Sequence, residues 1–126
     1  MLTADMKRII EEQGLGFVAT TAPDGTPNLS PKGAFFVVDD QMIAFGEVRS
    51  PGTIRNLRTS PRIEVNFVDP FVRKGYRFAG TADVVERGDG AFDALLGPLP
   101  RRARTAIARH RGDYGHQSAS PDIAGL

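Results

Sequence analysis

The sequence has 126 residues, of which 40% are apolar, and this suits one domain with a single core. Its 16 basic and 15 acidic residues leave a net charge of +1, so charge does not favour nucleic acid or a membrane as the main partner. The lack of cysteine excludes disulfides and cysteine-ligated metals, and no apolar run could span a bilayer. We therefore expect a single domain, residues 1–126, in a soluble, cytoplasmic protein.

The first part of the chain predicts a helix and a β-hairpin. Apolar residues recur at helical spacing from Thr3 to Gln13, Thr3 can cap this helix, and Gly14 can end it. Residues Leu15–Ala22 form a β-rich run, and Asp24-Gly25 is typical of a turn. We expect the returning strand to cover Thr26–Val38.

Polar residues alternate along this returning strand. Asn28, Ser30 and Lys32 fall on one face, and Leu29 falls on the other. Pro31 lacks a backbone donor, which predicts an edge strand or a bulge. Two interpretations stay open for the polar face: it binds a ligand, or it is an ordinary solvent-exposed face that includes a lysine.

A third strand, Met42–Gly46, leads into a junction that favours phosphate binding. Ser50 has the chemistry of an N-cap, and Pro51 suits the first position of a helix because its missing N–H costs nothing there. We expect this helix to cover residues 51–59, since Pro61 must follow its end.

The first turn of this helix can bind an anion. The backbone amides of Gly52 and Thr53 lie at the positive end of the helix dipole. Arg49 adds a charge, and Asn56 lies one turn after Thr53 and can reach the same anion. Ile54 and Leu57 are expected on the buried side. The alternative is that Ser-Pro only starts a helix.

The middle of the chain is rich in β-structure. Residues 62–67 alternate between polar and apolar, and Tyr76–Val85 predicts a long strand with Tyr76, Phe78 and Gly80 on one face. An aromatic and basic loop, residues 71–74, joins these strands. Because no long crossover helix occurs between the strands, a small antiparallel barrel is expected, followed by a short helix at 91–96.

Residues 98–126 are harder to interpret. The arginine-rich stretch from Arg101 to Arg111 fits a basic edge strand or a helix, and it resembles an ordinary basic surface more than a polyanion-binding stripe. His110, Asp113 and His116 do not match the spacing of a metal motif, so no metal site is expected.

The motifs together resemble the pyridoxamine 5'-phosphate oxidase-like family of FMN-binding split barrels. The matching segments are FVATTAPDGTPNLSPKG and IAFGEVRSPGTIRNLRTSPRIEVNFVDPFVRKGYRFAGTA, within residues 15–86. The resemblance implies a mainly β fold, a six-stranded Greek-key split barrel, and a homodimer with FMN at the subunit interface.

The resemblance also implies a cofactor site. The residues that would hold the ribityl phosphate and flank the isoalloxazine ring are Ser30, Lys32, Arg49, Ser50, Thr53 and Asn56. We expect the loop from Phe71 to Tyr76 to line the flavin cleft, with Tyr76 in contact with the cofactor. No residue is assigned a catalytic role, because the flavin supplies the redox chemistry.

The function implied is that of an FMN-dependent oxidoreductase acting on a small-molecule redox substrate. Two alternatives stay open: a reductase that uses the deazaflavin F420, and a flavin-binding or flavin-sensing protein without turnover. Pyridoxamine 5'-phosphate oxidase activity itself is disfavoured, because the chain has no Trp and only LPRRA near Leu99 where that enzyme carries an Arg-Leu-x-Pro segment.

Overall fold

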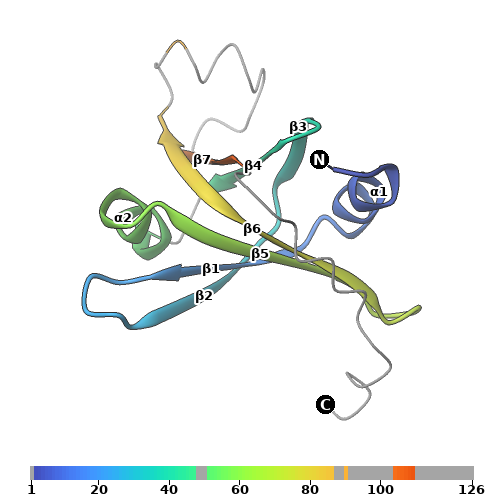
Figure 1. Ribbon diagram of the computed structural model, residues 1–126, viewed down its shortest axis with the longest axis horizontal. Coiled ribbons are helices and arrows are strands. Elements are labelled where there is room, and N and C mark those ends of the chain that lie inside the picture. The colour runs from blue at the N-terminus through green and yellow to red at the C-terminus, as the bar shows by residue number, and fades with distance from the viewer. Residues whose placement is uncertain (1, 48–50, 87–89, 91–103, 110–126) are drawn as a thin grey trace.

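The computed structural model describes residues 2–47, 51–86, 90 and 104–109, and these residues form two helices and seven strands (Figure 1). The expected helix at 91–96 lies outside the described residues. In chain order the elements are α1 (Ala4–Gln13), β1 (Gly16–Thr21), β2 (Pro27–Lys32), β3 (Phe35–Asp39), β4 (Met42–Glu47), α2 (Pro51–Thr59), β5 (Arg62–Asp69), β6 (Lys74–Val85) and β7 (Arg104–Arg109).

Both helices begin and end where local signals place them. Thr3 caps α1 by accepting a hydrogen bond from the Met6 amide at 3.3 Å, and Gly14 ends the helix with a φ of 64°, which glycine adopts without strain. Helix α2 begins at Pro51 and ends at Thr59, as predicted. Neither helix is long or apolar enough to cross a bilayer.

The described strands form one antiparallel sheet in the order β2-β1-β5-β6-β7-β4-β3. Its two edge strands, β2 and β3, follow one another in the chain, so the sheet curls until its edges approach at one corner. There the Gly46 amide donates to the Ala34 carbonyl at 2.8 Å. This arrangement is a split barrel, which confirms the predicted fold class.

The single returning strand that we expected at Thr26–Val38 is wrong, because the chain breaks at Gly33 and Ala34. Strand β2 pairs with β1, whereas β3 pairs with β4, so the two halves belong to opposite edges of the sheet. This break raises the strand count from six to seven. The prediction that Pro31 marks an edge strand is confirmed.

Two interpretations were open for the arginine-rich stretch, a helix and a basic edge strand; residues 104–109 form a strand, but this strand does not lie at the edge of the sheet. Residues Arg104–Arg109 form β7, which pairs with β6 on one side and with β4 on the other. Two neighbouring strands satisfy the backbone of β7, and an interior position follows from this pairing rather than from side-chain pattern. The rest of residues 98–126 lies outside the described part.

The core lies on the inner face of the curled sheet, between α1 at one end and α2 at the other (Figure 1). The residues of this face form three rows, each of which crosses β2, β1, β5 and β6 in that order. The first row is Asn28, Thr20, Ile63 and Gly80; the second is Ser30, Val18, Val65 and Phe78; the third is Lys32, Gly16, Phe67 and Tyr76. A Cβ at Gly16 would lie 2.7 Å from the Phe35 ring, so only glycine fits beneath this aromatic cluster.

Candidate functional site

Five buried polar side chains gather on the inner face beside α2. They are Thr20 on β1, Ser30 and Lys32 on β2, and Thr53 and Asn56 on α2, and they account for the polar residues in the buried class among the residues described. We call these five residues the inner polar cluster. Four of them, all except Thr20, were predicted from the sequence to bind the cofactor.

Hydrogen bonds tie α2 to the barrel through Thr20. The Asn56 side-chain amide donates to Thr20 Oγ1 at 3.1 Å, and the Asn28 amide donates to the same oxygen at 3.4 Å. Asn56 therefore has a structural role, but its second N–H and its carbonyl oxygen leave it able to contact a ligand as well.

Helix α2 contacts β1, β2 and β6. The chain leaves β4 beside Ala34, where Gly46 is hydrogen-bonded, and the three residues after Glu47 can span at most roughly 14 Å before Pro51. Further along the helix, Asn56 meets the row that contains Thr20 and Asn28. The helix and β2 are therefore close to each other, with Asn56 at the row of Thr20 and Asn28.

Thr53 is fully buried, and its hydroxyl has no hydrogen-bond partner within the described segments. The sequence predicted that Ile54 and Leu57 would take the buried side, yet Thr53 and Asn56 are buried too, because α2 covers a polar part of the inner face. Beside Thr53, a Cβ added at Gly52 would meet no atom within 4 Å, so space remains at the start of the helix.

Lys32 is only 5% exposed, and it faces inward with Ser30. The interpretation of this polar face as solvent-exposed is therefore wrong. The exposed face of β2 instead carries Leu29, which is 68% exposed. An inward-facing lysine beside apolar outward residues reverses the usual pattern, and this reversal indicates a role beyond packing.

The structure does not bring Tyr76 to α2. Tyr76 shares a row with Lys32 but lies three strands away, and it packs in the core at a ring-centroid distance of 6.3 Å from Phe78. Its hydroxyl donates to Asp5 on α1. At the tip of the same hairpin, Phe71 is 95% exposed. The expected contact between Tyr76 and a cofactor stays a prediction, and Arg49 and Ser50 lie outside the described residues.

Asp5 joins α1 to β6 through Lys74 and Tyr76, and it also pairs with Arg8 on its own helix. It accepts hydrogen bonds from Lys74 at 2.8 Å, from Tyr76 and from Arg8, and these three hold the pKa of the Asp5 carboxyl well below its usual range. The Asp5 carboxylate, together with burial, raises the pKa of Tyr76. The cluster therefore favours a charged Asp5 and a neutral Tyr76 at pH 7.

We expect Asp5→Asn to lower the melting temperature at pH 7, and this deficit to shrink below about pH 4. A carboxyl whose pKa is depressed on folding stabilises the protein above its unfolded value of about 3.9, and this stabilisation disappears as pH falls toward the folded value. Thermal melts from pH 3 to 8 measure the deficit. Thr3→Ala is the control, because loss of a neutral cap should cost about 1 kcal/mol at every pH. If the melting-temperature deficit of Asp5→Asn stayed the same from pH 3 to 8, the depressed pKa of Asp5 would not contribute to stability.

No group of three or more metal-ligating side chains occurs in the ranges that the structure describes. His110, Asp113 and His116 fall outside those ranges. Thr20 is the one member of the inner polar cluster that the sequence interpretation missed. The sequence pattern that could have identified it is the alternation along β1, because Gly16, Val18 and Thr20 lie at every second position and so share the inward face.

The architecture defines the class of split β-barrels, and comparison with known proteins gives the family. A family model for pyridoxamine 5'-phosphate oxidase matches residues 2–122. The chain therefore belongs to the pyridoxamine 5'-phosphate oxidase-like family. A search of the curated proteins returns no match.

Solved structures share this fold over most of their length. HupZ from Group A Streptococcus is 32% identical, with a TM-score of 0.75, over 86% of this chain and 89% of that chain. An F420 reductase is 25% identical, with a TM-score of 0.65, over 88% of this chain and 97% of that chain. HutZ, a heme storage protein from Vibrio cholerae, is 18% identical with a TM-score of 0.67, over 88% of this chain and 92% of that chain, and supports the fold alone.

Proposed function

We propose that the protein binds FMN and passes a hydride or electrons between the reduced flavin and a small acceptor. The observation that supports this proposal is the inner polar cluster, with a buried ammonium on β2 and a buried hydroxyl in the first turn of α2. An ammonium, hydroxyls and the start of a helix are the groups that bind phosphate in proteins. Family membership also supports a flavin as the cofactor.

The energetics of burial favour an anion at this place. The Thr53 hydroxyl is buried and makes no hydrogen bond with a described residue, and leaving such a group unsatisfied costs about 1–3 kcal/mol. A purely structural core would place apolar side chains at Lys32 and Thr53. A phosphate that accepts hydrogen bonds from both residues would offset this cost.

Four residues of the cluster have a binding role in this proposal, and the fifth, Thr20, has a positioning role. Lys32 and Ser30 on β2, with Thr53 and Asn56 on α2, hold the ribityl phosphate, and Lys32 also offsets negative charge on the phosphate or on the reduced ring. Thr20 positions Asn56 through the 3.1 Å hydrogen bond. FMN, when bound, supplies hydride or electron transfer, and the protein supplies orientation and electrostatics.

A second candidate cofactor is the deazaflavin F420. The observation that favours it is the F420 reductase, which is 25% identical over 88% of this chain. Both candidates place redox chemistry on a flavin-type ring, so the family and the fold do not separate them.

The absorption spectrum of the purified protein tests the proposal. A flavin spectrum, with FMN identified by mass after heat release, is the expected result. A colourless protein that is stabilised against heat by F420 but not by FMN would replace the first candidate by the second. Bound FMN that no physiological reductant reduces would indicate flavin binding without turnover, and a protein that binds neither cofactor would overturn the proposal.

We also propose that the protein is a homodimer with FMN at the interface. Leu15 and Phe36 remain exposed in the described part of the chain, and an obligate interface of about 2,000 Å² or more would cover apolar surface of this kind. Sedimentation equilibrium with and without FMN measures the mass. A monomer at micromolar concentration that retains stoichiometric FMN would contradict an interfacial site.

A further inference from the structure

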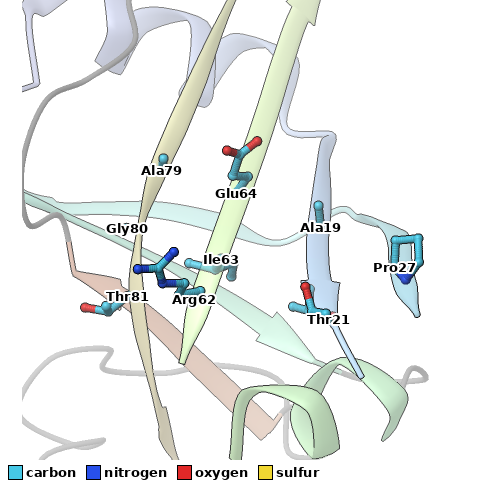
Figure 2. Close-up of a pocket in the computed structure, with 10 residues that line it drawn as sticks. Ala19, Thr21, Pro27, Arg62, Ile63, Glu64, Ala79, Gly80 and Thr81 are labelled. Atoms are coloured by element: carbon cyan, nitrogen blue, oxygen red, sulfur yellow. The ribbon is translucent and has the colours of Figure 1, made fainter. Parts of the chain in front are cut away.

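A cavity of about 500 Å³ lies on the face of β1, β5 and β6 that points away from the core (Figure 2). Most of its lining residues, among them Arg62, Glu64 and Ala79, face away from the core, and the inward-facing Thr20, Ile63 and Gly80 lie between them along the strands. The side chains of Lys32 and Ser30 are not part of the lining. Its volume is in the range of small-molecule sites. We call it the outer-face cavity.

Two opposite charges stand in this cavity, both on β5. Arg62 lies opposite Thr81 of β6, and Thr21 of β1 also lines the cavity (Figure 2). Glu64 is two residues further along β5, about 6–7 Å away along the strand. In the part of the chain described here, Arg62 and Glu64 form no ion pair with each other or with another residue.

Small side chains surround the two charges. Ala19 on β1 and Ala79 on β6 lie on either side of Glu64, and Gly80 follows Ala79 (Figure 2). A long side chain between two alanines leaves a hollow on each flank, with a flat floor of backbone and methyl groups. Such a floor accommodates a planar ring, and the hydroxyl of Thr21 can supply a further hydrogen bond near Arg62.

We propose that the outer-face cavity binds a small, flat molecule with an anionic group at one end and a hydrogen-bond donor at the other. The anionic group lies at Arg62 near Thr21, and the donor lies at Glu64. Glu64 repels the anionic end, so the two charges fix the direction in which the ligand lies. This site is distinct from the proposed FMN site and does not depend on it.

Three aromatic probes test the two ends of the site separately: 4-aminobenzoate, the neutral 4-aminobenzamide, and benzoate, which lacks the amine. Titration of the full-length protein, followed by amide chemical shifts, should show saturable changes for 4-aminobenzoate at Thr21, Glu64, Ala79 and Thr81. The amide analogue should bind about tenfold more weakly, because a charge-assisted hydrogen bond to Arg62 is lost. Benzoate should bind more weakly by a smaller factor.

Matched variants separate the cavity from general electrostatic attraction. Arg62→Gln and the cavity-filling Ala79→Leu should each weaken 4-aminobenzoate binding about tenfold or more. Arg77→Gln is the control, because Arg77 lies on the same face of β6 but outside the cavity. Equal losses for Arg62→Gln and Arg77→Gln, shifts that cluster elsewhere, or no saturable shift would each overturn the proposal. FMN affinity should be the same in all three variants, which keeps this test separate from that of the proposed function.

Discussion

Lys32→Met should weaken FMN binding about ten- to hundredfold, because it removes one charge-assisted contact of about 1.5–3 kcal/mol with the phosphate. Methionine retains an apolar chain of similar length at a position that is 5% exposed, so the apo-protein should fold normally and melt no lower than the wild type. Fluorescence quenching of FMN measures the affinity, and a thermal melt without cofactor measures the stability.

Riboflavin and a second lysine give the controls for this result. Riboflavin has no phosphate, so it should bind the wild type and Lys32→Met with similar, weaker affinity. Lys7→Met removes a lysine that pairs with Asp40 on the surface, and it should leave FMN affinity unchanged. Equal FMN affinity in Lys32→Met and the wild type would remove Lys32 from the site. An equal loss for riboflavin would place Lys32 at the ring instead of the phosphate.

Thr53→Val should change FMN affinity and apo-protein stability in different directions. Valine has nearly the shape of threonine but lacks the hydroxyl, which is buried and makes no hydrogen bond with a described residue. Without cofactor the variant should therefore be as stable as the wild type or more stable by up to about 1 kcal/mol. With FMN it should bind about tenfold or more weakly, because the hydroxyl is proposed to contact the phosphate.

A second threonine on α2 is the control for Thr53→Val. Thr59 donates to the Asn56 carbonyl at 3.0 Å within its own helix, at the exposed end of α2. Thr59→Val should leave FMN affinity unchanged. A Thr53→Val protein that is less stable without cofactor and binds FMN as the wild type does would show that the hydroxyl serves the fold and not the cofactor.

The sequence predicted those elements whose signals are local. Thr3, Gly14 and Pro51 act on their own helices through capping and a fixed φ, and α1 and α2 have the expected boundaries. The break at Gly33 and the interior position of β7 depend on strands that are far away in the chain: Met42 pairs with Arg109. No local pattern contains that information, so the single strand predicted at Thr26–Val38 was wrong and neither interpretation of the arginine-rich stretch placed β7 inside the sheet.

The site was predictable in its membership but not in its orientation. Side chains alternate between the two faces of a strand, so Ser30 and Lys32 share a face in any fold. From hydrophobicity alone, however, Leu29 would be expected to face inward and Lys32 to face outward. The structure does the reverse. Thr20 was missed because its role appears only when β1 lies beside α2, where one hydroxyl accepts hydrogen bonds from two asparagines.

The position of β7 in the sheet bears on how the chain folds during synthesis. In the described sheet, β7 (Arg104–Arg109) stands between two groups of strands. One group is β2-β1-β5-β6, and the other is the pair β4-β3. The ribosome completes β7 after every other described strand. Until then β6 and β4 each present an unpaired edge, which can pair with another chain. The barrel is therefore completed only when β4 pairs with β7, roughly sixty residues further along the chain. Until that pairing forms, the nascent chain can associate with other chains through its unpaired strand edges.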